Sequence, residues 1–283
     1  MQKKLYDNKA LNKLLVVNKP MFRTSNSYLN QIKRKYKNKK AGFSGTLDPF
    51  ACGCLIVAFG QYSKLFNYMQ KTPKTYRTVI WLGATSESLD TENIIDIKDE
   101  KKLDENHLKE EIKNLVKTHD YYPPKFSAKK IDGKRAYDRA RNGEEFEMKK
   151  SSMTIYNTKF ISYRHPFITF EATVSEGSYI RSLAQILLKK FDVEGTLSYL
   201  NRLNEGKFYF ENEKDLNPLD FIDLEENIYS GEKNYFQDGK IISIDFLDKK
   251  EDGEYIIKFD DFFSIIQIKE NEVKYLLNKV RLD

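Results

Sequence analysis

Short apolar segments separated by turn residues dominate the first third of the chain and predict several strands. Residues 14–20 (LLVVNKP) form an apolar run that ends at Pro20, which is typical of a short buried strand. Residues 75–83 (TYRTVIWLG) alternate apolar and polar positions and are rich in β-forming side chains, which predicts a second strand. Another apolar run covers 54–60 and precedes a helical pattern at 61–71.

Helical spacing occurs in three longer segments. In 25–37, aromatic and aliphatic side chains recur every four residues, and Ser25 is the predicted N-cap. A charged amphipathic helix is predicted over 100–118, and the prolines at 123 and 124 are expected to stop it. Its inward positions are Leu103, Leu108, Ile112 and Leu115 or Val116. The third helix covers 178–191, after a turn at Gly177.

The remaining segments mix strands, a long loop and a small tail. Strands are predicted at 153–164 and 168–176, and a short helix at 136–141 inside a polar, basic stretch. A long loop of this kind in a compact domain is usually functional or mobile. From about residue 227, short apolar runs predict a small acidic β module with strands at 240–246, 254–259 and 264–270.

Charge is distributed unevenly, and the asymmetry indicates a polyanionic partner. Residues 1–80 contain 16 Lys or Arg but only two acids, whereas residues 211–283 contain 10 Lys or Arg and 19 Asp or Glu. A solvated lysine face explains scattered lysines but not the near absence of acids before residue 80. A basic surface of this density attracts nucleic acid. The 283 residues, 40% of them hydrophobic, suit one large domain or a large and a small one.

Several kinds of chemistry lack their sequence signatures. The three histidines share no ligand spacing, and Cys52 and Cys54 have no second pair nearby, so we expect neither a metal site nor a disulfide framework. Nucleotide-binding glycine loops and a nucleophile elbow are absent too, and no cofactor is expected. No apolar run approaches the ~20 residues of a membrane span, and the N-terminus lacks a signal-peptide core. We therefore expect a cytoplasmic protein.

One carboxylate stands out within the basic region. Asp48 lies in AGFSGTLDPFACGC (residues 41–54), just after six Lys or Arg residues between Lys33 and Lys40. Asp-Pro pairs are common in turns, so a structural role is the simplest interpretation. The flanking glycines would let a second backbone approach, and the positive surroundings would keep the carboxylate ionised and able to act as a nucleophile or base. Because it would repel phosphate, it should act on a base or sugar.

The same segment resembles a known family motif. GTLDPFACG resembles the G-[ST]-L-D-P-x-A-[ST]-G motif of the bacterial TruB-type tRNA pseudouridine-55 synthases. Further blocks resemble the family in the same order over about residues 14–210, namely NKP, KTYR, PPKFSAKKIDGKRAYDRAR, GSYIRSLAQIL and YLNRLNEGKF. The tail looks like a shortened and diverged version of the PUA-type RNA-binding module found in many members.

The resemblance implies a fold and a division of the chain. It implies an α+β fold, in which a mixed, largely antiparallel central sheet is flanked by helices and followed by a small β-rich module. We expect a pseudouridine synthase catalytic domain over 1–225, with 123–150 as an RNA-contacting lid loop, and a diverged PUA-like module over 226–283. Asp48 should lie in a cleft across the centre of the sheet.

The resemblance also implies an isomerase. Such enzymes flip a uridine out of the tRNA T-arm, break its N-glycosidic bond, turn the base and rejoin it through carbon, and they also assist tRNA folding. The resemblance gives Asp48 the role of nucleophile, Arg181 the role of its ion-pair partner, and Tyr76 the role of stacking on the flipped base. The remaining expected contacts are Tyr179 and Leu200 in the uracil pocket, Lys19 beneath the pocket or near a phosphate, Phe43 against the T-loop and Asp90 near the RNA.

Three residues depart from the family pattern. Phe43 replaces a histidine, which retains stacking but removes a titratable group, so we expect retained activity with a weaker pH dependence of RNA binding. Asn18 replaces an aspartate and removes one negative charge beside the RNA. Phe22 replaces a glycine, so the local turn is expected to differ.

Two alternative functions remain open at this point. A non-catalytic RNA-binding or RNA-folding protein could use the same groove, and a related synthase could act on a ribosomal or guide-RNA-directed site. The presence of Asp48, Tyr76 and Arg181 together favours catalysis, because a pure binder would gain by losing a buried acid beside phosphate. We expect a monomer whose partner is the T-arm of tRNA, with neither membrane nor metal contact.

Overall fold

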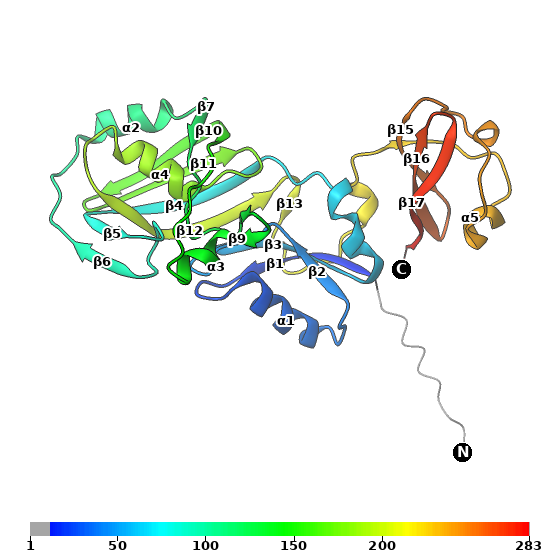
Figure 1. Ribbon diagram of the computed structural model, residues 1–283, viewed down its shortest axis with the longest axis horizontal. Coiled ribbons are helices and arrows are strands. Elements are labelled where there is room, and N and C mark those ends of the chain that lie inside the picture. Colours follow the sequence, from blue (N-terminus) through cyan, green and yellow to red (C-terminus); the bar gives the residue numbers. More distant parts are fainter. Residues whose placement is uncertain (1–11, 283) are drawn as a thin grey trace, which may run out of the picture.

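The computed structural model describes residues 12–282, which form a large sheet followed by a smaller one (Figure 1). In this range the large sheet has nine strands; seven follow the order β1-β3-β12-β4-β11-β10-β7, while β2 pairs with β3 and β13 with β12. Its pairs are antiparallel except for β3 with β12, which is parallel. The predicted α+β fold with a mixed, largely antiparallel sheet is confirmed.

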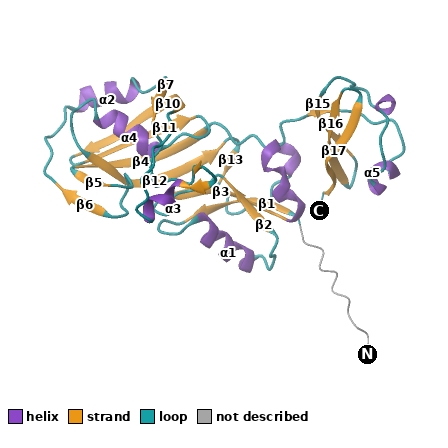
Figure 2. Ribbon diagram, viewed as in Figure 1, coloured by secondary structure: helices purple, strands orange, loops and turns teal. Residues whose placement is uncertain are grey.

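Strands contain more residues than helices in the regions around both sheets (Figure 2). The large sheet consists of β1 (Lys13–Lys19), β2 (Ala41–Ser44), β3 (Cys52–Phe59), β4 (Lys74–Leu82), β7 (Thr118–Tyr121), β10 (Ser151–Arg164), β11 (Phe167–Val174), β12 (Gly195–Glu205) and β13 (Phe208–Tyr209). Two hairpins are formed by β5 (Ala84–Ser86) with β6 (Ile94–Ile97) and by β8 (Lys130–Ile131) with β9 (Lys134–Arg135). The small sheet consists of β14 (Glu225–Glu226), β15 (Gly253–Lys258), β16 (Phe262–Lys269) and β17 (Glu272–Arg281).

Helices connect and cover these strands. The α-helices are α1 (Ser25–Lys35), α2 (Glu105–Lys113), α3 (Ala136–Arg141), α4 (Ile180–Leu188) and α5 (Asn234–Asp238), and the 3₁₀ helices are η1 (Gly60–Tyr68), η2 (Pro218–Asp220) and η3 (Ile244–Phe246). The main core of the large sheet contains Leu108 and Ile112 from α2 and Leu183 and Leu187 from α4. Because α4 packs on this core, Arg181 in its first turn is held at the centre of the sheet.

The β1–β3 end of the large sheet is buried on both faces. Successive side chains of a strand point to opposite faces. Accordingly, Leu15 and Val17 belong to the apolar cluster beneath α1, whereas Leu14 and Val16 belong to a second cluster. That second cluster also contains Leu65 of η1 and Phe263 of the small sheet, and β17 contacts η1, so η1 joins the two sheets through one apolar cluster.

Two helix boundaries differ from those predicted. The N-cap of α1 is Thr24, whose Oγ1 accepts the N–H of Ser27 at 3.0 Å. The hydroxyl of Ser25, the predicted cap, bonds to the backbone of Leu47 instead. Helix α2 is shorter than 100–118, because Asp104 caps its start and residues 118–121 pair with β10 as β7 well before the prolines.

The tail and the segment after β3 also differ in detail. Residues 240–246, predicted as a strand, contain the 3₁₀ turn η3, while β17 is a strand that the apolar pattern did not predict. The predicted helix at 61–71 is the 3₁₀ helix η1, which lies from 60 to 68. Within 12–282, no helix has both the length and the apolar composition needed to cross a membrane.

Candidate active site

Asp48 lies in the loop between β2 and β3, and the backbone just before it is fixed by α1. The hydroxyl of Ser25 donates to the carbonyl of Leu47 at 3.1 Å, and its oxygen accepts the N–H of Leu47 at 2.9 Å. After the acid, the N–H of Ala51 donates to the carbonyl of Asp48 at 3.1 Å. The Asp48 side chain is 29% exposed, so it is anchored through its backbone while its carboxylate stays accessible.

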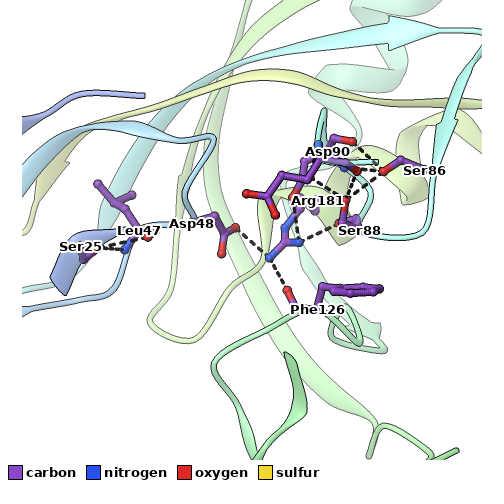
Figure 3. Close-up of polar contacts among 9 residues, drawn as sticks. Ser25, Leu47, Asp48, Ser86, Ser88, Asp90, Phe126 and Arg181 are labelled. Atoms are coloured by element: carbon purple, nitrogen blue, oxygen red, sulfur yellow. Dashed lines mark hydrogen bonds and ion pairs between the residues drawn. The ribbon is translucent and has the colours of Figure 1, made fainter. Parts of the chain in front are cut away.

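Arg181 connects Asp48 to two other segments, which contain Phe126 and the pair Ser88 and Asp90 (Figure 3). Its Nη2 lies 2.8 Å from Asp48 Oδ2 and donates to the carbonyl of Phe126 at 2.9 Å. Its Nη1 donates to the carbonyl of Ser88 at 2.7 Å and to Asp90 Oδ2 at 3.1 Å. The guanidinium is buried, and charge-assisted bonds of this kind fix its plane. The predicted pairing of Arg181 with Asp48 is therefore present in the structure.

Asp90 lies behind Arg181 and not on an open surface. It is 2% exposed, and its Oδ1 accepts the Ser88 hydroxyl at 2.6 Å and the Glu92 N–H at 2.9 Å. Burial raises the pKa of Asp90, while Arg181 and these hydrogen bonds oppose the rise. That Asp90 lies near the RNA stays a prediction; in the structure its carboxylate pairs with Arg181 and helps to hold it.

Three of the predicted aromatic and apolar residues line one cavity with Asp48 and Arg181. This cavity has a volume of 590 Å³, and its walls include Tyr76, Tyr179 and Leu200. Tyr76 comes from β4, Leu200 from the neighbouring strand β12, and Tyr179 from the residue before α4. Burial raises the pKa of both tyrosines, so both phenols are neutral at pH 7.

Residues 123–150, the expected lid segment, and Phe43 contribute to a second cavity, which shares Asp48 with the first. Phe43, Asp90, Arg135 and Arg141 are among the residues that line it, and Asp48 and Arg181 line both cavities. Residues 123–150 contain the β8–β9 hairpin and α3, and the carbonyl of Phe126 ties this segment to Arg181. The lid segment therefore contacts the same guanidinium that holds Asp48.

Lys19 lies beneath the turn that follows β1 and lines neither cavity. Its buried ammonium donates to the carbonyls of Pro20 at 3.0 Å, Arg23 at 2.5 Å and Pro49 at 3.3 Å. Burial lowers the pKa of Lys19 to about 8. Within this turn Phe22 has φ +60° and is 73% exposed, so the chain adopts there a conformation that favours glycine.

The sequence reasoning missed a buried group of charges beside Tyr76. Lys74, Arg202 and Glu205 are buried, and the first two line the cavity with Tyr76. The alternation of side chains along a strand could have identified two of these charges. Lys74 precedes Tyr76 by two residues and Arg202 follows Leu200 by two, so each shares a face with a predicted pocket residue.

Metal-binding residues do not gather in the described part of the chain. Across residues 12–282, no group of three or more His, Cys, Asp or Glu side chains is arranged to hold a metal ion. Cys52 and Cys54 are free, and Cys54 is buried. The groups that line the site include the accessible Asp48 carboxylate, the buried cations of Arg181, Arg202 and Lys74, and the tyrosines around them.

Known proteins are similar to this chain in sequence. The family described as "TruB family pseudouridylate synthase (N terminal domain)" matches residues 33–180. The protein named tRNA pseudouridine synthase B of a Sulfurovum species is 51% identical over 270 residues, covering 95% of this chain and 98% of the relative. The protein of the same name from a Nitratiruptor species is 54% identical over the same shares.

Solved structures with little sequence identity share the fold. A chain from the "Crystal Structure of a Cbf5-Nop10-Gar1 Complex" superposes with a TM-score of 0.63 at 16% identity, covering 96% of this chain and 84% of that one. The "Structure of H/ACA RNP bound to a substrate RNA containing 2'-deoxyuridine" gives a TM-score of 0.61 at 15% identity, covering 96% and 85%. From the family match and the close relatives, the chain belongs to the TruB family of pseudouridylate synthases, enzymes that isomerise uridine to pseudouridine.

Proposed function

We propose that this chain isomerises the uridine at position 55 in the T-loop of tRNA, with Asp48 as the nucleophile. The observation that carries the proposal is the Asp48 carboxylate, which is 29% exposed on the wall of a 590 Å³ cavity and lies 2.8 Å from the Arg181 guanidinium. Such a carboxylate is accessible, oriented and paired with a fixed cation. The names of the close relatives support tRNA as the substrate.

The proposed reaction follows from the residues around the cavity. A uridine leaves its stack and enters the cavity, where Tyr76 gives its base a new aromatic surface. Asp48 then attacks either C1′ of the ribose or C6 of the base, and the N-glycosidic bond breaks. The turned base is rejoined to C1′ through C5, the bond to Asp48 breaks, the C5 proton is lost to solvent and N1 gains a proton. Arg181, oriented by Asp90, holds the carboxylate for this attack.

The charge distribution supports a specific mode of RNA binding. The T-arm is proposed to lie along α1 and the lid segment 123–150, because residues 1–80 carry 16 Lys or Arg and only two acids. Residues 226–283 are proposed to be a diverged PUA-like module with a minor share in affinity, and residues 1–225 the catalytic domain. We further propose that the protein acts as a monomer and assists tRNA folding while it is bound.

Release of tritium from uridine labelled at C5 tests the substrate and the nucleophile. With labelled tRNA, the wild type should release one equivalent, and a tRNA with cytidine in place of the T-loop uridine should release none. Asp48→Asn should abolish release while gel-shift binding persists. Binding without release by the wild type on any tRNA would refute the proposed reaction and favour an RNA-folding protein that uses the same groove.

A further inference from the structure

A second group of charges is buried beside Tyr76, and the reaction proposed above does not use it. Lys74, Arg202 and Glu205 are 8%, 1% and 0% exposed. They come from the neighbouring strands β4 and β12, whose register places Lys74 opposite Glu205 and Tyr76 opposite Arg202. The pairing of these two strands therefore gathers all three charges at one point.

Glu205 is at the centre of this group. Its Oε1 lies 3.4 Å from Lys74 Nζ and accepts the Ser44 hydroxyl at 3.0 Å, and its Oε2 lies 3.2 Å from Arg202 Nη2. Ser44 is the last residue of β2, immediately before the turn that leads to Asp48. The carboxylate thus joins β4 and β12 to the segment that carries the proposed nucleophile.

Arg202 is bonded to the same segment and lies beside Tyr76. Its Nη2 donates to the carbonyl of Gly45 at 2.8 Å, and its Nε donates to the carbonyl of Cys54 at 2.8 Å. The guanidinium also lies beside Tyr76, which the register of β4 and β12 places opposite Arg202, and it opposes the rise that burial causes in the pKa of the Tyr76 phenol. One rigid side chain therefore fixes both ends of the loop between β2 and β3 and lies beside the proposed stacking residue.

The turn lies directly on these charges. Gly45 has φ +62°, and a Cβ at this position would lie 2.7 Å from Glu205 Oε1 and 2.9 Å from Arg202 Nη1. Any larger residue would push the turn away from the ion pair. Gly45 is three residues before Asp48, so a displacement here would be passed on to the carboxylate.

Stability alone is a weak reason to bury three charges. Removing ions from water is costly, and replacing a buried ion cluster with apolar residues is often neutral or stabilising. We propose that Lys74, Glu205 and Arg202 are positioning residues for the isomerisation, which hold Tyr76 and the 44–48 turn in place and act on the chemical step and not on RNA affinity. This proposal rests on the function proposed above.

Glu205→Gln is the sharpest test, because Glu205 is fully buried and lines neither cavity, so it cannot contact RNA. Glutamine keeps the size and the acceptor for Ser44 but removes the charge between two cations. We expect the single-turnover rate of tritium release to fall by about 100-fold, as for a small misplacement of reacting groups. The Kd for tRNA should stay within about threefold of the wild type, the scatter expected when no RNA contact changes.

Glu171→Gln is the matched control. Glu171 on β11 pairs with Arg77 on β4 at 2.6 Å, so this substitution removes an acid from another cross-strand pair of the same sheet. Neither the rate nor the Kd should change. Glu205→Gln should also be combined with Tyr76→Phe. If Glu205 acts through Arg202 on the Tyr76 hydroxyl, the double variant should lose less than the product of the two single losses.

A second variant keeps the proposal testable if Glu205→Gln does not fold. Ser44→Ala removes one hydrogen bond to Glu205 and should lower the single-turnover rate by about tenfold with an unchanged Kd. A wild-type rate in either folded variant, or a parallel loss of rate and affinity, would overturn the proposal. An active wild type with an inactive Asp48→Asn and a normal Glu205→Gln would overturn only this inference, whereas an inactive wild type would refute the proposed function itself.

Discussion

The candidate active site and the small sheet contain similar ion pairs in different surroundings. Arg181 and Asp48 lie 2.8 Å apart, and the Arg181 side chain is 3% exposed. In the small sheet, Lys258 and Glu226 lie 2.7 Å apart, but their side chains are 40% and 51% exposed. The distances are nearly equal, so distance says little about importance. Burial decides it, because an exposed pair is screened by water while a buried one fixes its partners or leaves a bare charge when broken.

The two ends of the chain also differ in net charge. The first 80 residues carry a large positive excess, and residues 211–283 carry 19 acids against 10 Lys or Arg. The acidic segment also touches the basic one, since Glu213 accepts from Lys35 at 2.6 Å and from the Tyr36 hydroxyl at 2.7 Å. Glu213 thus neutralises part of the positive charge on the surface expected to bind RNA.

The largest effect is expected for Arg181→Met, which disrupts the buried ion pair. It removes the cation beside Asp48 and leaves Asp90 buried without its charge partner. The single-turnover rate should fall by about 1,000-fold, the range seen when a preorganised charge partner is lost. Lys258→Met is the control in the small sheet and should leave the tritium-release rate unchanged. A loss of less than tenfold in Arg181→Met would contradict the role given to the guanidinium.

Burial of Lys19 should make the free energy of unfolding depend on pH. Its folded-state pKa of about 8 lies below the ordinary value of 10.5, so between these values the unfolded chain binds more protons and the free energy of unfolding rises with pH. The rise should amount to about 3 kcal/mol for this group. Urea unfolding of the wild type and of Lys19→Met, from pH 7 to 10, should show that the free energy of unfolding of the wild type rises relative to that of the variant. A parallel pH dependence in both proteins would refute it.

Exposed basic residues should differ in their effect on RNA binding according to their region. Replacing Arg34, Lys39 and Lys40 together with methionine should weaken tRNA binding by about tenfold at low salt and reduce the salt dependence, because phosphate contacts are lost. The matched triple change of Lys250, Lys258 and Lys274 in the tail should alter the Kd by less than about twofold. Equal losses in the two variants would show that the tail carries RNA affinity.

The smallest effect is expected for Glu226→Gln in the small sheet. Its pair with Lys258 is exposed, so the free energy of unfolding should change by less than about 0.5 kcal/mol. Chemical unfolding measures this directly. A change above about 2 kcal/mol would mean that exposed ion pairs also stabilise this fold strongly, and it would contradict the difference expected between buried and exposed pairs.

Much of the fold and part of the site could be predicted from the sequence. Alternating and apolar runs located β1, β4, β10 and β11, because burial on a sheet imposes that spacing. The motifs and their order identified Asp48, Tyr76 and Arg181 as candidate site residues. The structure places all three around one cavity.

What escaped prediction depends on contacts between distant residues. Lys74 faces Glu205 only because β4 and β12 pair in one register, and nothing local in either segment specifies it. Asp90 is buried because Ser88, Glu92 and Arg181 enclose it, although an acid in a polar segment is usually exposed. Thr24, and not the predicted Ser25, is the N-cap of α1, because the Ser25 hydroxyl bonds to the backbone of Leu47.

The most direct test of the central claim compares two aspartates that each form a close pair with a cation. Asp48 lies 2.8 Å from Arg181 beside the cavity, and Asp261 lies 2.6 Å from Lys233 in the tail. Single-turnover tritium release should be abolished by Asp48→Asn, with tRNA binding retained, and should be unchanged by Asp261→Asn. Persistent release by Asp48→Asn would contradict the claim that this carboxylate is the nucleophile.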